Sequence, residues 1–409
     1  MDHLRNLPDK IEAVTVELPE GIAGGLTKPA QYQFTYLPDA TPVSKTMPIK
    51  AEPYNSGVLH PIFEMNLPEG FIRRYLSDLL IRYTKIDDLL FLALQGKNGI
   101  GRLSYKSVIE REEVETDSLE EILAWSGEGL FQSLLRRHVF NGTLSGVQPK
   151  VLLNAGEERS SLVSPQYIVK TGGPEFPRLA LNEYLCLSFA REAGIAVPDV
   201  WLSDNQELLV LKRFDQRNGL QLGMEDYCVL MGKQGGDRYR SSYESGAKVA
   251  GPLYRVGPEG LIEYYRYVVF SCIVRNGDAH LKNFALLYEH PSEQPWLAPL
   301  YDVVCTSLYP DMEDGLALKM NGSKEFPTRE GLVKFGIGIG LKDPDSIIEQ
   351  LGDLVSDSLK KSDFKTEYPE FFDAVSNSLD HSMALSSSAG YRSSAKRKKP
   401  RKLDSYLKK

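Results

Sequence analysis

The chain has 409 residues, of which 42% are apolar and 25% charged, a composition typical of globular proteins with two or three domains that have cores of their own. It contains no run of 18 apolar residues and no apolar signal segment in residues 1–6, so that we expect a cytoplasmic protein without a transmembrane helix. The net charge is −7, but residues 392–409 hold nine Lys/Arg and one Asp, so that this tail carries +8 and the remaining body −15. An acidic body is poorly suited to a large nucleic-acid surface of its own.

Residues 12–110 are predicted to form a small α/β unit. Apolar and polar residues alternate over 13–18 and again over 32–37, which is the pattern of strands. An i, i+3, i+4 apolar pattern that begins at Phe71 predicts a helix, and a second helix is expected over 87–94. We find no metal-binding or nucleophile constellation in this region.

A junction between domains is predicted over residues 111–120, which are polar and acidic. Ser118 followed by Glu121 has the pattern of a capping box, and we expect it to open a helix that continues to Leu135. The first domain is therefore expected to end near residue 115.

A loop over residues 142–150 reads Gly-Thr-Leu-Ser-Gly-Val-Gln-Pro-Lys and precedes a strand-like run, 151–153. Its glycines, hydroxyls and Lys150 suit a loop that lies over phosphates, because glycine allows close backbone approach and free N–H groups face the anion. The pattern is not a Walker A motif, since Gly-Lys-Ser/Thr is absent. A plain hairpin explains the same residues.

A strand over 167–170 ends in Lys170, and the predicted helix over 181–194 carries Glu183 and ends at Gly194, a residue typical of the position after a helix C-terminus. A strand lysine paired with a helix glutamate positions the α- and β-phosphates in protein kinases. Lys170 and Glu183 follow that order along the chain. Two unrelated surface charges are the alternative.

The apolar run 208–211 predicts a buried strand that leads into Lys212 and Phe214, where a hinge between two lobes would lie. A hinge offers backbone donors and acceptors to adenine, and Phe214 can pack on the base, although a core phenylalanine explains this residue equally well. The later stretch 232–252 is rich in Gly, Ser, Lys and Arg and is predicted to be an exposed, mobile loop.

Residues 275–283 (Arg-Asn-Gly-Asp-Ala-His-Leu-Lys-Asn) concentrate polar side chains between two apolar runs, 267–274 and 284–288. Phosphoryl transfer requires a carboxylate that orients the attacking hydroxyl and accepts its proton, and a carboxamide that holds a magnesium ion. Asp278 and Asn283 have the five-residue spacing that these two groups have in protein kinases. A polar turn whose Asp and Asn satisfy local backbone groups is the alternative.

A second candidate metal ligand, Asp302, lies near the end of an apolar run over 297–304. Magnesium retains several waters and takes few protein ligands, so that one further carboxylate near Asn283 completes a site. An Asp that caps a turn after a strand is the alternative, but the order of the elements favours metal binding.

Helices are predicted in the C-terminal part over 332–335, 345–354 and 371–379, and the Ser-rich and then basic residues 385–409 are expected to form a disordered tail. The cysteines are scattered within apolar stretches, so that buried thiols are expected, without disulfides or a zinc site. They are Cys186, Cys228, Cys272 and Cys305.

The ordered set of a Gly/Ser loop, strand Lys, helix Glu, hinge, Asp-x-His-x-Lys-Asn and Tyr-Asp resembles the HipA family of bacterial toxin kinases. The resemblance covers residues 12–380 and rests on segments 144–150, 168–170, 182–184, 212–215, 225–228, 277–283 and 300–302. Residues 42–44 and 66–70 are also similar to the N-terminal accessory subdomain of that family.

The resemblance implies an α/β (α+β), bilobal protein-kinase-like fold. An α/β accessory subdomain is expected over residues 1–115, and a kinase-like domain over 116–384, with its N-lobe over about 116–222 and a helical C-lobe over 223–384. The resemblance also implies ATP and Mg²⁺ as cofactors and a protein hydroxyl as the acceptor, with an aminoacyl-tRNA synthetase as the substrate and growth arrest as the outcome. The implied partner is a helix-turn-helix antitoxin, similar to HipB, which tethers the complex to DNA; no membrane partner is implied.

On the positions that match, Asp278 is the expected catalytic base, His280 stabilises its loop and Lys282 neutralises the transferring phosphoryl group. Asn283 and Asp302 are the expected magnesium ligands. Contacts to ATP are expected from Lys170, Glu183, Lys212, Phe214, Gly146, Gln148 and Lys150. The family autophosphorylates a serine in the phosphate loop, and here either Thr143 or Ser145 fits that position.

Two other functions fit the same sequence. One is a weakly active corepressor that is tethered to DNA by its antitoxin. The other is a small-molecule or lipid kinase, because Asp-x-His-x-x-Asn also occurs in the phosphatidylinositol kinase branch.

Overall fold

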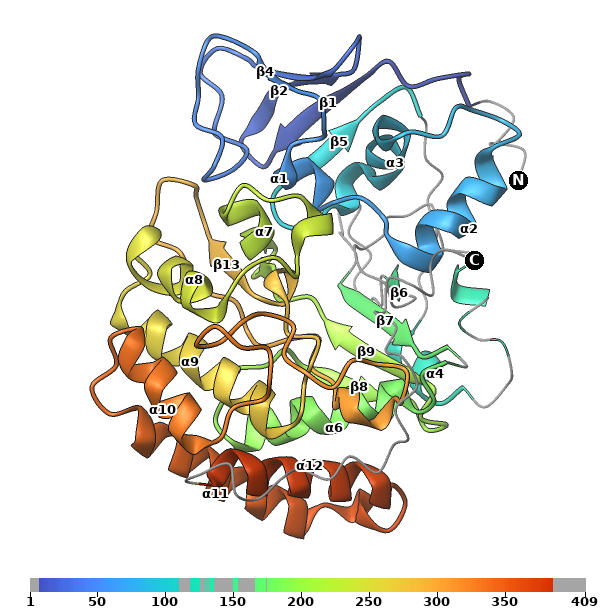
Figure 1. Cartoon of the computed structure of the whole chain (residues 1–409). Helices are drawn as coiled ribbons and strands as arrows, with labels where there is room; N and C mark the ends of the chain where they lie inside the picture. Colours follow the sequence, from blue (N-terminus) through green and yellow to red (C-terminus); the bar gives the residue numbers. More distant parts are fainter. Residues whose placement is uncertain are drawn as a thin grey trace. The chain divides into compact units, whose positions relative to one another are not determined.

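The computed structural model describes residues 7–109, 118–125, 129, 131, 133–135, 150–153, 166–173 and 175–384 (Figure 1), and for 150–153 it describes the main chain. The chain divides into two compact units. The first unit consists of residues 1–180, 200–235 and 287–293, and the second of residues 181–199, 236–286 and 294–409. Each unit is therefore assembled from segments that lie far apart in the sequence.

The first unit contains a five-stranded antiparallel sheet in the order β4-β3-β2-β1-β5. Its strands are β1 (Ala13–Leu18), β2 (Gly21–Thr27), β3 (Tyr32–Tyr36), β4 (Tyr54–Ser56) and β5 (Ser104–Lys106). The strands predicted over 13–18 and 32–37 are thereby confirmed. Val14, Val16 and Leu18 of β1 are buried, as the alternation in the sequence requires of a strand with one face on a core.

Helices α1 (Pro61–Glu64), α2 (Gly70–Leu80) and α3 (Asp88–Gln95) belong to the same unit, and the last two confirm the helices predicted from Phe71 and over 87–94. Helix α2 buries one row of apolar side chains, at Ile72, Leu76 and Leu80. Helix α3 begins at Asp87, whose carboxylate accepts the Leu90 N–H at 3.0 Å. The buried side chains of both helices and of β1–β3 form one apolar core.

The single helix predicted over residues 118–135 was wrong in its extent. Helix α4 (Leu119–Leu123) does begin with the capping box of Ser118 and Glu121, but it ends after about one turn. Gly129 has a φ of 77°, a left-handed conformation that interrupts an α-helix, and the described residues 131 and 133–135 beyond it are helical. The described residues of this stretch therefore do not form one continuous helix.

A second antiparallel sheet of the first unit has the order β6-β7-β9-β8. Its strands are β6 (Lys150–Leu153), β7 (Tyr167–Thr171), β8 (Val200–Leu202) and β9 (Leu208–Lys212), which confirms the strands predicted at 151–153, 167–170 and 208–211. The register pairs Lys150 with Lys170. The elements β10 (Gln216–Arg217), β11 (Leu220–Gln221), β12 (Gly223–Asp226) and α7 (Tyr227–Leu230) follow.

The buried carboxylate of Glu225 forms hydrogen bonds that connect distant segments of the first unit. It accepts hydrogen bonds from Ser44 Oγ at 2.8 Å, Lys45 N at 2.8 Å and Tyr288 Oη at 2.6 Å. The Lys45 Nζ atom donates to two carbonyls of the segment 287–293, each at 2.8 Å. Burial raises the pKa of the Glu225 carboxyl above its usual value in spite of these donors.

The second unit is mostly helical. Its helices include α6 (Leu179–Glu192), α8 (Tyr243–Lys248), a π-helical turn (Val249–Leu253), α9 (Pro258–Ile273), α10 (Arg329–Gly338), α11 (Pro344–Lys361) and α12 (Pro369–Met383). Its strands include β13 (Ala285–Tyr288) and β14 (Trp296–Leu297). Two of the boundaries between the two units fall within these elements: α6 belongs to the second unit from Leu181, and β13 belongs to it up to Leu286. Short 3₁₀ turns among the described residues include η3 (Gly235–Asp237) at the boundary of this unit, η5 (Leu281–Asn283), η6 (Thr306–Leu308) and η7 (Asp363–Lys365). The helices predicted at 181–194, 332–335, 345–354 and 371–379 are confirmed, and Gly194 follows α6 with a φ of 71°.

The exposed, mobile loop predicted over 232–252 was wrong, because this stretch contains α8 and several buried residues. The Ser242 hydroxyl accepts the Ser245 N–H at 3.2 Å and caps the helix, so that a serine that composition assigned to a loop is a helix signal. Gly246 packs against Tyr264, and a Cβ at this position would lie 2.1 Å from the Tyr264 hydroxyl. Here glycine provides close packing instead of flexibility.

All four cysteines are buried free thiols, as predicted. Burial raises the pKa of Cys272 to about 12 and that of Cys305 to about 11, which keeps both thiols protonated and unreactive at neutral pH. Within the part of the chain that the structure describes, no helix is both long and apolar enough to cross a membrane.

Candidate functional site

The polar loop of the second unit begins where α9 ends. The Asn276 N–H bonds to the Ser271 carbonyl at 2.7 Å and the Arg275 N–H bonds to the Cys272 carbonyl at 3.2 Å, which together form a Schellman motif. Arg275 occupies the left-handed position of this motif, with a φ of 58°, where glycine is usual. The chain therefore turns sharply off the helix directly before the predicted catalytic residues.

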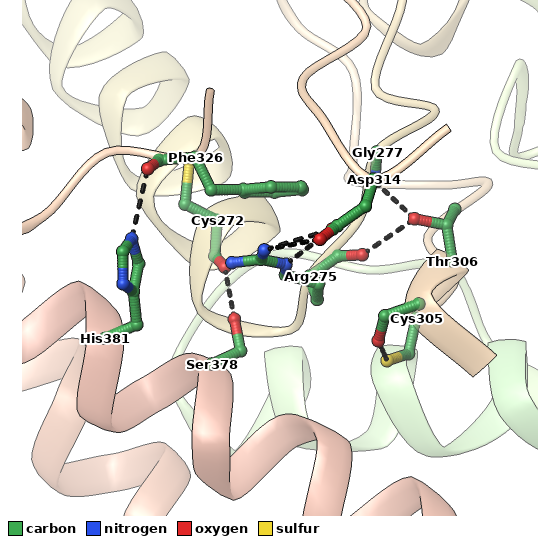
Figure 2. A network of polar contacts seen from close by, with 10 residues as sticks. Cys272, Arg275, Gly277, Cys305, Thr306, Asp314, Phe326, Ser378 and His381 are labelled. Atoms are coloured by element: carbon green, nitrogen blue, oxygen red, sulfur yellow. Dashed lines mark hydrogen bonds and ion pairs between the residues drawn. The ribbon is translucent and has the colours of Figure 1, made fainter. Parts of the chain in front are cut away.

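The Arg275 side chain is held by partners from later in the chain (Figure 2). Its Nε and Nη2 atoms each bond to an Asp314 carboxylate oxygen at 3.0 Å, a two-point ion pair, and its guanidinium lies 4.1 Å from the centre of the Phe326 ring. The Arg275 carbonyl accepts the Thr306 hydroxyl at 2.9 Å. Side chain and main chain of this residue are thus both anchored to the segment 306–326.

At position 277 the space around Cα is too small for a side chain, so that only glycine fits. Its N–H bonds to Thr306 Oγ1 at 2.9 Å, as Figure 2 also shows. A Cβ at this position would lie 2.6 Å from the Gly315 carbonyl oxygen and 2.8 Å from Thr306 Oγ1. The close approach of two main chains therefore requires glycine directly before Asp278.

Asp278 is half-buried and its main chain is fixed at both ends. Its N–H bonds to Asn276 Oδ1 at 3.1 Å, and its carbonyl accepts the His280 N–H at 2.7 Å. Its carboxylate oxygen Oδ1 accepts a hydrogen bond of 2.8 Å from the hydroxyl of Tyr239. Tyr239 was not predicted to belong to this site.

The 3₁₀ turn η5 fixes the residues that follow. Asn283 Oδ1 accepts the His280 N–H at 3.2 Å, and the Asn283 N–H bonds to the His280 carbonyl at 3.0 Å. The Asn283 Nδ2 atom lies 3.5 Å from the Asp302 carbonyl oxygen, and the Tyr301 hydroxyl bonds to the Lys282 carbonyl at 2.8 Å. The Asn283 side chain thus adjoins the main chain of Asp302, and the role of these two residues as magnesium ligands stays a prediction.

Asp302 does not follow a strand, in contrast to the expectation from its apolar neighbours. Strand β14 ends at Leu297, and no strand is present over 298–304. Asp302 has a φ of 54°, a left-handed conformation that is rare outside glycine and that occurs preferentially at functional sites. The segment after it is tied to α6, because the Asn182 side chain accepts the Cys305 N–H at 2.8 Å and donates to the Cys305 carbonyl at 3.0 Å.

The predicted magnesium ligands are one carboxylate and one carboxamide on adjoining segments. This donor set suits an ion that keeps most of its waters. Among the described residues, no group of three or more His, Cys, Asp or Glu side chains is placed to hold a metal ion, and the magnesium site stays a prediction.

Other predicted residues lie in the first unit. Lys170 is buried on β7, Lys212 is exposed at the end of β9, and Phe214 is half-buried. Glu183 is fully buried on α6 in the second unit, so that its pairing with Lys170 stays a prediction. Of the phosphate loop, only the main chain of Lys150 is described; Thr143, Ser145, Gly146 and Gln148 lie outside the described residues.

The segment that the sequence predicted as a hinge contains a buried ion pair, which the sequence analysis did not predict. Arg213 and Asp215 are joined at 2.6 Å, and both also bond to the main chain of the N-terminal segment. The Arg213 Nη2 atom donates to the Gly99 carbonyl at 2.8 Å, and Asp215 accepts the Gly101 N–H at 2.8 Å. This pair therefore connects the chain after β9 to the region before β5.

Comparison with known proteins gives the family. The family model described as HipA N-terminal domain matches residues 14–106, and the model described as HipA-like C-terminal domain matches residues 142–359. The chain belongs to the HipA family. The resemblance inferred from the sequence motifs is thereby confirmed.

Two curated relatives are named as kinases. "Putative kinase Y4dM" of Sinorhizobium fredii is 27% identical over 299 residues, which cover 68% of this chain and 69% of the relative. A "Putative kinase" of Haemophilus influenzae is 31% identical over 242 residues, which cover 51% of this chain and 70% of the relative.

A solved HipA structure has the same fold. HipA of Shewanella oneidensis MR-1, in a complex with HipB and its operator DNA, superposes with a TM-score of 0.69 at 19% identity, over 90% of this chain and 96% of that chain. The mixed α/β, kinase-like bilobal fold expected for this chain is thus confirmed.

Proposed function

We propose that this HipA-family chain is a Ser/Thr protein kinase that transfers the γ-phosphate of ATP to a protein hydroxyl. The observation that carries the proposal is the loop after α9, in which hydrogen bonds fix Asp278 and Asn283, and in which the Asn283 side chain adjoins the main-chain carbonyl of Asp302. Such an arrangement is what phosphoryl transfer requires, because its catalysis consists mainly of positioning and charge stabilisation. The names of the curated relatives support the same reaction class.

Each residue of the loop has a proposed role. Asp278 orients the acceptor hydroxyl and takes its proton, Lys282 neutralises charge on the transferring group, and His280 holds the loop through its main-chain bonds. Asn283 and Asp302 would hold Mg²⁺, which supplies charge neutralisation at the phosphates when bound.

The residues proposed to hold the nucleotide are those expected from the sequence. Lys170, supported by Glu183, contacts the phosphates, and Lys212 and Phe214 border the adenine. Gly146, Gln148 and Lys150 belong to the phosphate loop, in which Thr143 or Ser145 is the proposed site of autophosphorylation.

The proposed partner is a helix-turn-helix antitoxin similar to HipB, which links the complex to DNA. The complex of the Shewanella HipA with HipB and operator DNA supports this proposal. An aminoacyl-tRNA synthetase is the proposed substrate, and growth arrest is the expected outcome of its phosphorylation.

The central test is transfer of labelled γ-phosphate from Mg-ATP by the purified full-length chain. Asp278→Asn or Asp302→Ala is expected to abolish the transfer while the melting temperature stays within a few degrees of the wild type, because neither residue belongs to the apolar core. Wild-type turnover by either variant would contradict the residue assignment. A wild type that binds its antitoxin but transfers no phosphate would favour the corepressor function, and labelling of lipids or small molecules alone would favour the other kinase class.

A further inference from the structure

We propose that Tyr239 is a positioning residue for Asp278. Its phenol holds the carboxylate in the orientation in which this group receives the proton of the acceptor hydroxyl. The inference rests on the proposed function, in which Asp278 is the base.

Tyr239 contacts two residues of the loop at once. Its hydroxyl donates to Asp278 Oδ1 at 2.8 Å, and its ring meets the His280 ring edge-on, with the centroids 5.0 Å apart and an interplanar angle of 78°. The ring contact fixes the direction of the phenol, and the hydroxyl fixes the carboxylate.

Residues on both sides of Tyr239 are bonded to the same loop, Arg238 through its main chain and Tyr243 through its side chain. The Arg238 carbonyl accepts the Leu281 N–H at 3.2 Å, and the buried Tyr243 hydroxyl donates to the Ala279 carbonyl at 3.0 Å. A residue held in this way on each side is a fixed support. A residue that blocks the base until substrate arrives would instead need a segment that can move away.

The support matters because the position of the base decides the rate. A hydrogen bond to an ionised carboxylate is stronger than one between neutral groups, and it restricts rotation of the carboxylate about its own bond. A base that samples several orientations loses part of the advantage of being positioned beside the reacting hydroxyl. The fixed-support role and the blocking role therefore predict opposite changes in rate when the hydroxyl is removed.

The test compares Tyr239→Phe with the wild type in the full-length chain, with Mg-ATP as substrate and both ADP release and labelling of the chain as readouts. The variant keeps the ring on His280 and loses the hydroxyl. We expect kcat to fall about 10- to 100-fold, with the KM for ATP and the melting temperature unchanged. Tyr265→Phe is the matched control, because it removes a phenol that bonds to the Leu332 carbonyl at 3.0 Å elsewhere in the unit, and its kcat is expected to stay at the wild-type value.

Other outcomes overturn the proposal. An unchanged kcat in Tyr239→Phe means that the hydroxyl does not support the base, and a higher kcat means that it blocks the base. A raised KM at constant kcat assigns the residue to nucleotide binding. Asp278→Asn separates this failure from that of the proposed function: if this variant is inactive while Tyr239→Phe behaves as wild type, the role of Tyr239 alone is wrong.

Discussion

Arg275 adopts a conformation that its residue type disfavours. A left-handed φ costs a residue with a Cβ roughly 1–2 kcal/mol, and the surroundings must offset that cost. The two-point pair with Asp314 and the Phe326 ring supply the contacts on the side chain, and Thr306 supplies those on the main chain. The direction in which the chain leaves α9 toward Asp278 therefore depends on residues from a distant segment.

Replacing Asp314 tests this dependence. We expect Asp314→Ala to lower kcat about 10- to 100-fold at an unchanged KM for ATP, because a loop that is displaced by a small distance loses the alignment of its base. Asp311→Ala is the matched control, since it removes an exposed carboxylate from the same segment. Equal kcat values for the wild type and Asp314→Ala would show that the pair is dispensable for the loop.

The residues of the site differ in how well the sequence could predict them. Asp278 and Asn283 could be recognised because they lie within one short loop, so that their spacing in sequence is also their spacing in space. Tyr239 and Asp314 each reach the loop from 39 residues away, and neither lies in a periodic pattern that indicates a site. Only the folded chain brings such residues to Asp278 and Arg275.

At the scale of elements, regular strands and long amphipathic helices could be predicted, because burial on one face imposes a period on the sequence. The strand β1 and the helix α11 are such cases. Composition was a poor guide in residues 232–252, where Ser242 caps a helix and Gly246 packs closely. Serine and glycine have several structural uses, and their frequency alone does not distinguish a loop from a capped, tightly packed helix.

The loop over 142–150 is the element for which we expect regulation. A phosphate on Thr143 or Ser145 adds about −1.5 to −2 charges beside the phosphates of ATP and competes for the same donors. We therefore expect the phosphorylated chain to bind ATP far more weakly. Mass spectrometry after incubation with Mg-ATP, followed by a measurement of ATP affinity, checks both parts.

Variants separate the two hydroxyls of this loop. Thr143→Ala and Ser145→Ala are expected to differ, because only the variant that lacks the modified hydroxyl should keep full ATP affinity after incubation. Unchanged affinity in a stoichiometrically phosphorylated sample would rule out the switch, whatever the catalytic activity of the chain.

At the scale of the whole molecule, we expect residues 385–409, whose last part is basic, to be dispensable for catalysis. Helix α12 is complete at Met383, and the last described residue, Ala384, accepts the Arg329 N–H at 3.1 Å. We expect a chain truncated before Leu385 to keep its ATP turnover and melting temperature. Any salt-dependent binding to DNA or RNA should be lost, since the tail carries +8 and the body −15.

A second variant separates charge from length in this experiment. A full-length chain in which the nine Lys/Arg of residues 392–409 are replaced by Gln should behave as the truncated chain does in nucleic-acid binding. Loss of ATP turnover on truncation would place the tail within the fold.

Because the first unit consists of separate segments of the chain, the ribosome makes its last part well after its first part. The region that matches the HipA N-terminal domain ends at residue 106, but the segments that complete the unit extend to residue 293. At about 5–20 residues per second, a ribosome needs roughly 10–40 s to make the intervening chain. Early in that interval the hydrogen-bond partners of the main chain at Gly99 and Gly101, which are Arg213 and Asp215, have not yet been synthesised. The same holds for Glu225, the partner of the Lys45 N–H. The strands β1–β5 and helices α1–α3 lie within residues 13–106, so the main sheet of this unit is fully synthesised early, whereas its bonds to Arg213, Asp215 and Glu225 form only after those residues have left the ribosome.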